Sequence, residues 1–231
     1  MLNTSIHHLF PTLLTETKYD MNQKILDIIY DNWKTHYTNG YSNEGTGNVD
    51  IHTDESFKDL YIFLNKCVIE YLKVMGISSE NFNINFVKSW FNSLENIPTP
   101  MHCHADAHIS VVYYAQTPPS TDQIIRFNDR NESRELFYGA SRNNSFEMNE
   151  FNSSIYSVAP AEGTALVFPA RVYHDTIGEN KGFHKEEPPV NTENDLRRKR
   201  ICIASDVILT YKEKSSKSLG LQPISQWRRF S

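Results

Sequence analysis

The hydrophobic periodicity of this chain changes at Phe82, and that change limits the possible folds more than any other feature. After Phe82, short segments rich in β-branched and aromatic residues alternate with turn residues, which is the pattern of β-strands. We predict six strands, at residues 84–91, 102–114, 123–127, 154–158, 164–168 and 201–209. Many short strands in a segment of this length favour two packed sheets that form a barrel.

Before Phe82 the apolar residues instead recur at the spacing of an amphipathic helix. One helix is predicted to start near Asp20, which can cap it, and to end before the glycine- and asparagine-rich residues 39–47. A second is predicted to start at Thr53 or Asp54 and to end before Gly76, which lies where a left-handed residue belongs. We expect both helices to pack outside the barrel and to bury their aromatic residues.

The 231 residues, 39% of them hydrophobic, can build one sizeable core. No repeat or linker divides the chain, so we predict a single domain over residues 1–231. It would have a helical part at about 1–80, a mainly β core at about 82–210 and a basic tail at 211–231. Two long polar stretches, 129–153 and 178–199, are expected at the mouth of the barrel. Because the first also carries aromatic residues, we predict that it is a substrate lid.

Composition excludes several classes of partner. The net charge of -5 gives no general attraction to nucleic acid or to anionic membranes, so neither is expected to bind. The three cysteines are odd in number and widely spaced, which argues against a disulfide framework and a thiolate zinc site. The sequence has no secretory signal pattern and no run of 18 apolar residues, so we predict a cytoplasmic protein.

The histidines carry the strongest chemical signal. His102 and His104 lie two residues apart in a predicted strand, so their side chains can share one face. His174 follows, in a predicted loop, the apolar strand that ends at Pro169. Two close ligands and one distant ligand are the layout of a mononuclear non-haem iron site. A second register, in which His104, Asp106 and His174 are the ligands, gives the common H-x-D spacing and stays open.

Further motifs along the chain are Phe10-Pro11-Thr12, Ser89-Trp90, His102-x-His104, Ser110 to Tyr114, Gly163 to Pro169 with His174, and Arg200 to Ala204. In this order they resemble the motifs of the 2-oxoglutarate/Fe(II) oxygenases common among marine bacteria and their phages. The resemblance runs from Phe10 to about Asp206 and implies a double-stranded β-helix, or jelly roll, of the prolyl-hydroxylase type. It implies Fe(II) as cofactor and 2-oxoglutarate and dioxygen as cosubstrates, with hydroxylation of an unidentified substrate.

The resemblance also implies roles for individual residues. His102, His104 and His174 would bind iron, which favours the H-x-H register. Arg200 would bind the far carboxylate of 2-oxoglutarate, and Tyr114 would face the same molecule. A planar guanidinium suits this task because it forms two parallel hydrogen bonds to a carboxylate.

Some alternatives remain at this stage. Arg198 shares the strand parity of Arg200 and is its rival, and Cys202 replaces the serine of the frequent Arg-x-Ser motif. Two other function classes fit the histidine pattern: a cupin-like metalloenzyme without 2-oxoglutarate, and a non-catalytic barrel that only binds a partner. The sequence does not identify the substrate, which could be a small molecule or a macromolecule, or the oligomeric state.

Overall fold

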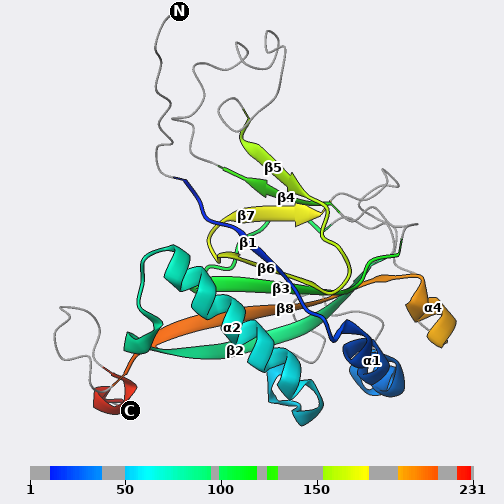
Figure 1. Ribbon diagram of the computed structural model, residues 1–231, viewed down its shortest axis with the longest axis horizontal. Helices are drawn as coiled ribbons and strands as arrows, with labels where there is room; N and C mark the ends of the chain where they lie inside the picture. The colour runs from blue at the N-terminus through cyan, green and yellow to red at the C-terminus, as the bar shows by residue number, and fades with distance from the viewer. Residues whose placement is uncertain are drawn as a thin grey trace, which may run out of the picture.

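The computed structural model describes seven stretches of the chain: residues 11–37, 50–94, 99–118, 124–129, 153–176, 192–212 and 223–229. Two antiparallel sheets form its centre (Figure 1). The larger sheet has the order β1-β6-β3-β8-β2, and the smaller has the order β5-β4-β7. The strands are β1 (Thr15–Lys18), β2 (Phe82–Leu94), β3 (Ile109–Gln116), β4 (Ile125–Asn128), β5 (Ile155–Val158), β6 (Thr164–Pro169), β7 (Tyr173–Thr176) and β8 (Arg200–Tyr211).

The larger sheet is buried on both faces, and residue parity separates the two. Odd-numbered residues of β3 and β8, such as Val111 and Ile203, join the cluster that the helices cover. Even-numbered residues, such as Tyr114 and Cys202, join a second cluster with Phe127 of the smaller sheet. Because both faces are covered, all eight residues of β3 are buried. The even face therefore forms the interior between the two sheets.

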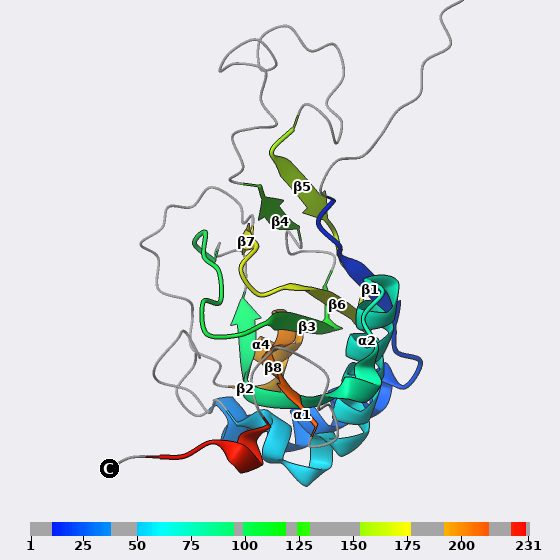
Figure 2. The same cartoon turned by 90° about the vertical axis from the view of Figure 1, so that its left-hand side faces the viewer.

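Helices cover the face of the larger sheet that lies away from the smaller sheet (Figures 1 and 2). They are α1 (Asn22–Tyr37) and α2 (Lys58–Val74). The short α4 (Glu193–Arg197) lies just before β8, and 3-10 turns occur at Ile51–Thr53, Glu55–Phe57, Ser79–Asn81 and Ile224–Gln226. None of the described helices is long and apolar enough to cross a membrane.

The helix predictions are confirmed, with small shifts at the ends. The second helix begins as two 3-10 turns, and Asp54 caps the second of these by accepting a hydrogen bond from the Ser56 amide at 2.9 Å. Gly76 has φ +74°, the left-handed conformation expected after the helix. The first helix starts at Asn22, two residues after the predicted cap. Local sequence signals therefore fixed these elements well.

The start of one predicted strand and the loop predicted at His174 are wrong, and one strand was missed. The strand predicted at 102–114 starts only at Ile109, because a turn at residues 105 and 106 separates it from the histidines. His174 lies in β7 and not in a loop, since this short polar strand pairs with β4. The polar β1 was not predicted, and it pairs with the edge of β6.

The two long polar stretches are described only in part. The second contains α4, whose N-cap Thr192 forms a capping box with Asp195. Residues 130–152, which hold most of the predicted lid, lie outside the described residues.

Candidate metal centre

Three histidines come together at one end of the space between the sheets. His102, His104 and His174 each offer a ring nitrogen within 4.8 Å of the others. Their ring centroids lie 4.3 Å apart for His102 and His174, 5.2 Å for His102 and His104, and 5.3 Å for His104 and His174. In the described part of the chain, this is the group of histidine, cysteine and acidic residues that could hold a metal ion.

Backbone hydrogen bonds place the segment that carries His102 and His104. The amide of His102 donates to the carbonyl of His174 at 3.0 Å, and the amide of His174 donates to the carbonyl of His102 at 2.8 Å. The amide of His104 donates to the carbonyl of Ala170 at 2.8 Å. The segment before β3 is thus hydrogen-bonded to the connection between β6 and β7 and to β7 itself. This is why the three histidines meet although His102 and His104 lie outside a strand.

Hydrogen bonds at Nδ1 determine which nitrogen of each ring faces the group. His102 Nδ1 lies 2.8 Å from the carbonyl of Pro100, and His174 Nδ1 lies 2.9 Å from the carbonyl of Val172. A carbonyl can only accept, so Nδ1 carries the proton in both rings and Nε2 carries the free lone pair. His104 Nδ1 lies 2.5 Å from Oδ1 of Asp206, and an ionised carboxylate likewise requires a proton on Nδ1.

Burial keeps His174 neutral. His174 is 5% exposed. Its pKa is lowered to about 3, mainly by desolvation and also by the neighbouring His102 and His104 rings, while the hydrogen bond to Val172 opposes the shift. A metal binds neutral imidazole, so His174 is ready to bind at physiological pH. Three imidazoles whose Nδ1 atoms are engaged elsewhere can each offer Nε2, and such a set of nitrogen ligands fits Fe(II).

The rival metal ligand lies outside this group. Asp106 is exposed and sits in the turn before β3, and the structure does not bring it to the histidines. Cys103 lies between the two histidines in the sequence but does not join the group either.

Arg200 begins β8 on the interior face. Its side chain is buried, and its Nε has no hydrogen-bond partner among the described residues. Tyr114 lies beside it on β3, opposite Cys202. Burial raises the pKa of the Tyr114 hydroxyl above its ordinary value, Cys202 raises it further, and the positive charge of Arg200 offsets part of this increase. The two residues predicted to hold 2-oxoglutarate are therefore electrostatic neighbours, and the buried guanidinium has donor capacity left for a carboxylate.

Arg198, the rival of Arg200, points elsewhere. It is exposed at the C-terminal end of α4, where it forms an ion pair with Asp195 at 2.7 Å. The parity argument for Arg198 fails because the chain is helical there, so Arg198 does not share the interior face of β8.

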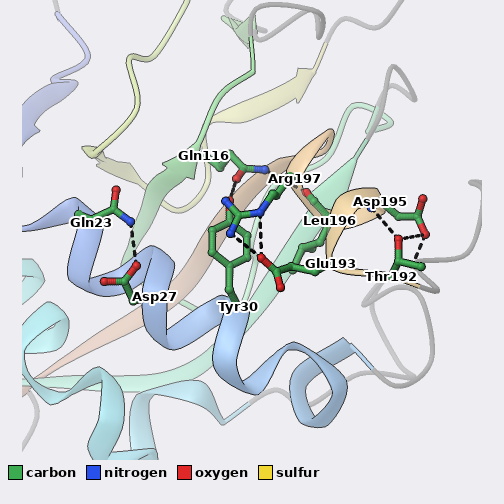
Figure 3. A network of polar contacts seen from close by, with 9 residues as sticks. All are labelled: Gln23, Asp27, Tyr30, Gln116, Thr192, Glu193, Asp195, Leu196 and Arg197. Carbon is green, nitrogen blue, oxygen red and sulfur yellow. Dashed lines mark hydrogen bonds and ion pairs between the residues drawn. The ribbon is translucent and has the colours of Figure 1, made fainter.

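A polar network fixes the point where β8 starts (Figure 3). Gln116 at the end of β3 donates from Nε2 to the carbonyls of Leu196 at 3.0 Å and Lys199 at 2.6 Å. The hydroxyl of Tyr30 on α1 donates to Oε1 of the same glutamine. The guanidinium carbon of Arg197 lies 4.0 Å from the centroid of the Tyr30 ring, and Nε of Arg197 donates a hydrogen bond to Oε1 of Glu193 (Figure 3). The network anchors the residues immediately before Arg200.

The sequence interpretation missed both Gln116 and Asp206. Asp206 shares the strand parity of Arg200, six residues earlier on β8, so its interior-facing position could have been inferred, but its contact with His104 could not. Nothing in the local sequence marks Gln116, because its partners come from α1 and α4.

A comparison with family models matches residues 88–186 to the family described as "Putative 2OG-Fe(II) oxygenase". Residues 88–186 belong to this oxygenase family. The matched segment contains all three histidines and Tyr114 and ends before Arg200. The protein is a 2-oxoglutarate/Fe(II)-dependent oxygenase, with Fe(II), 2-oxoglutarate and dioxygen as its cofactor and cosubstrates. No curated protein matches the chain.

Similar solved structures cover most of the chain, beyond the segment that the family model matches. They confirm the predicted jelly-roll fold. A prolyl-4-hydroxylase from Pseudomonas putida has a TM-score of 0.51 at 10% identity, over 85% of this chain and 92% of that one. The α-ketoglutarate-dependent epimerase SnoN of nogalamycin biosynthesis has a TM-score of 0.52 at 12% identity, over 92% and 86%. The carbocyclase SnoK of the same biosynthesis has a TM-score of 0.52 at 8% identity, over 92% and 89%.

Proposed function

We propose that this oxygenase hydroxylates a C–H bond of its substrate and that His102, His104 and His174 hold its iron. One observation carries the assignment: the Nδ1 atom of each ring is engaged by an acceptor outside the group, which leaves all three Nε2 lone pairs for one cation. Such outward hydrogen bonds orient metal-binding imidazoles and fix their tautomer. Asp106, exposed in the turn, has no part in this proposal.

The bound iron, when present, supplies the activation of dioxygen that is coupled to decarboxylation of 2-oxoglutarate to succinate. Three protein ligands leave coordination positions free for molecules from solution. The residues of the protein bind and orient the cosubstrate and the substrate, and they exclude water. The apolar interior face, with Val112, Leu166 and Phe168 buried, provides a dry wall beside the histidines.

Arg200 and Tyr114 are proposed to hold the far carboxylate of 2-oxoglutarate. A buried guanidinium with an unmet donor is costly unless an anion completes it. The raised pKa of Tyr114 keeps its hydroxyl protonated, so it can donate a second hydrogen bond to the same carboxylate. Asn92 Oδ1 and Ser110 Oγ, on strands that flank β8, are also buried and lack partners among the described residues. This unmet hydrogen-bonding capacity supports a polar ligand between the sheets.

Hydroxylation is proposed here, and the fold alone does not determine it. Among the similar structures, one is a prolyl-4-hydroxylase, whereas the two nogalamycin enzymes are an epimerase and a carbocyclase. One fold supports several outcomes because the substrate decides which bond reacts. Arg200 supports 2-oxoglutarate chemistry over a cupin-like reaction without that cosubstrate.

We further propose that residues 1–231 form one domain that acts in the cytoplasm on a substrate that is neither a membrane nor nucleic acid. The three free cysteines support a reducing compartment. The net charge of -5 supports the exclusion of polyanionic partners.

Anaerobic reconstitution tests the function. The protein is mixed with Fe(II) and then with 2-oxoglutarate, and the absorption spectrum is followed for a metal-to-ligand charge-transfer band. Admission of oxygen should then give succinate. The proposal is supported if the band appears only when Fe(II) and 2-oxoglutarate are both present and succinate forms after oxygen is admitted. Iron binding without any response to 2-oxoglutarate would instead indicate a cupin-like metalloenzyme.

A further inference from the structure

Asp206 lies against the outer nitrogen of one proposed iron ligand. Its Oδ1 is 2.5 Å from Nδ1 of His104, and both side chains are largely buried, with exposed fractions of 12% and 8%. Asp206 projects from the interior face of β8, opposite Ser110 on β3 and Lys88 on β2. No sequence motif marked this contact, and it requires the register of three strands.

The charge of the three-histidine group indicates what this contact does. The usual site for this kind of iron has two histidines and a carboxylate, so the ligands themselves neutralise part of the metal charge. A group of three neutral imidazoles contributes no negative charge. A divalent cation in a partly buried site of this kind is poorly compensated unless an anion stands nearby.

Resting on the proposed function, we propose that Asp206 is a positioning residue that supplies through His104 the negative charge absent from the three-histidine group. Its carboxylate holds His104 in the tautomer with the proton on Nδ1 and directs Nε2 toward the metal. The accepted hydrogen bond also makes the imidazole a stronger electron donor. Asp206 does not touch the metal itself, because its carboxylate contacts the nitrogen on the far side of the ring.

The surroundings of Asp206 do not offer another explanation for its burial. Lys88 is its direct neighbour across the β2–β8 pair, but its Nζ lies 4.7 Å over the ring of Trp90. Trp90 in turn stacks on the face of His104, with centroids 5.5 Å apart. Within the described residues, the hydrogen-bond partner that the structure gives to the Asp206 side chain is therefore His104. Asp206 and Trp90 together fix both the rotation and the plane of this one ring.

The test compares two isosteric substitutions, Asp206→Asn and Asp175→Asn, by Co(II) binding to the full chain. Asp175 is a matched control because it is also a buried aspartate, one residue from His174, but its oxygens bond Arg126 at 2.7 and 2.5 Å. Asp206→Asn keeps an oxygen that can accept from Nδ1 while it removes the charge. We expect it to lower Co(II) affinity by about 10–100-fold and to shift the visible Co(II) bands.

The control should lose thermal stability but keep the Co(II) bands of the wild type, with a much smaller change in affinity. Equal affinity and identical bands in Asp206→Asn and the wild type would overturn the role of Asp206 while leaving the metal site intact. If the wild type itself binds no Co(II), the proposed function fails and this inference falls with it.

A measurement on the wild type covers the case in which Asp206→Asn does not fold. Nitrogen-15 NMR of the metal-free protein reports the imidazole tautomers directly, with His104 assigned through its backbone. The expected result is a protonated Nδ1 and an unprotonated Nε2 at His104. A proton on Nε2 would overturn the inference, because that nitrogen could then not face a metal.

Discussion

His102 and His174 exchange two backbone hydrogen bonds, of 3.0 and 2.8 Å, although one lies before β3 and the other in β7. The bridge brings the two segments together through main-chain atoms. These main-chain bonds do not involve the imidazole rings, so the bridge between the two segments should remain when a ring is replaced. This separation makes substitutions of the ligands informative.

The first prediction concerns the identity of the ligands. Replacing His102, His104 or His174 with alanine should reduce affinity for Co(II) by more than the roughly 10–100-fold typical of losing a group that only hydrogen-bonds a ligand. A site with three protein ligands cannot spare one. Asp106→Ala is the control and should bind like the wild type. Isothermal titration calorimetry measures all four, and loss of binding in Asp106→Ala with normal binding in His102→Ala would reverse the assignment.

The second prediction separates Arg200 from Arg198. Arg200→Lys should weaken 2-oxoglutarate binding by about tenfold or more, because a lysine cannot make the paired hydrogen bonds and each such bond contributes about 1.5–3 kcal/mol. Arg198→Lys should have little effect, since this exposed side chain pairs with Asp195. Titration of 2-oxoglutarate into the Fe(II)-loaded variants without oxygen gives both constants. The opposite ranking would transfer the role to Arg198.

The third prediction addresses the network before β8. Gln116→Leu removes the donor to the carbonyls of Leu196 and Lys199. Because the two carbonyls then stay buried without a hydrogen bond, the free energy of unfolding should fall by about 1–3 kcal/mol. The start of β8 should shift, so 2-oxoglutarate affinity should fall while Co(II) affinity stays constant. Tyr30→Phe keeps both Gln116 donor bonds and should have the milder effect. Equal losses of Co(II) and 2-oxoglutarate affinity in Gln116→Leu would show that the network does not act through Arg200.

Much of the site could be predicted because its signals are local. The H-x-H pair and the apolar strand before His174 appear in short stretches of sequence, and so does the motif from Ser110 to Tyr114 that carries the resemblance. The continuous strand from His102 to Tyr114 was wrong because the turn at Ala105 and Asp106 contains no glycine or proline to mark it. Tyr114 nevertheless faces the interior, because β3 sets its direction independently of the histidine segment.

The remaining features depend on tertiary structure. Strand β7 is short and polar, and it exists because its residues pair with β4. Asp206 meets His104 only after β8 has taken its register against β3, and Gln116 meets α4 only after β3 and β8 are paired. Contacts of this kind leave no periodic pattern in the sequence, so they require the folded structure.

The fourth prediction concerns alkaline stability. Tyr71 on α2 is 2% exposed, and burial raises the pKa of its hydroxyl from 10.0 to about 12. The unfolded chain therefore loses this proton before the folded chain does. The stabilising contribution is complete below pH 10 and is lost as pH rises toward 12, with a loss of about 1.4 kcal/mol at pH 11. Urea unfolding at pH 9 and pH 11 should show a smaller pH effect in Tyr71→Phe, and an unchanged pH effect would contradict this reasoning.

The most direct test of the three-histidine centre is a crystal structure of the protein loaded with Fe(II) under nitrogen, with the metal located by its anomalous scattering. We predict one peak per chain at roughly 2.1 Å from Nε2 of each of His102, His104 and His174, the usual length of a bond between a metal and an imidazole. The Asp206 carboxylate should remain on Nδ1 of His104. A peak bound by Asp106, or by Nδ1 of any of the three rings, would contradict the account.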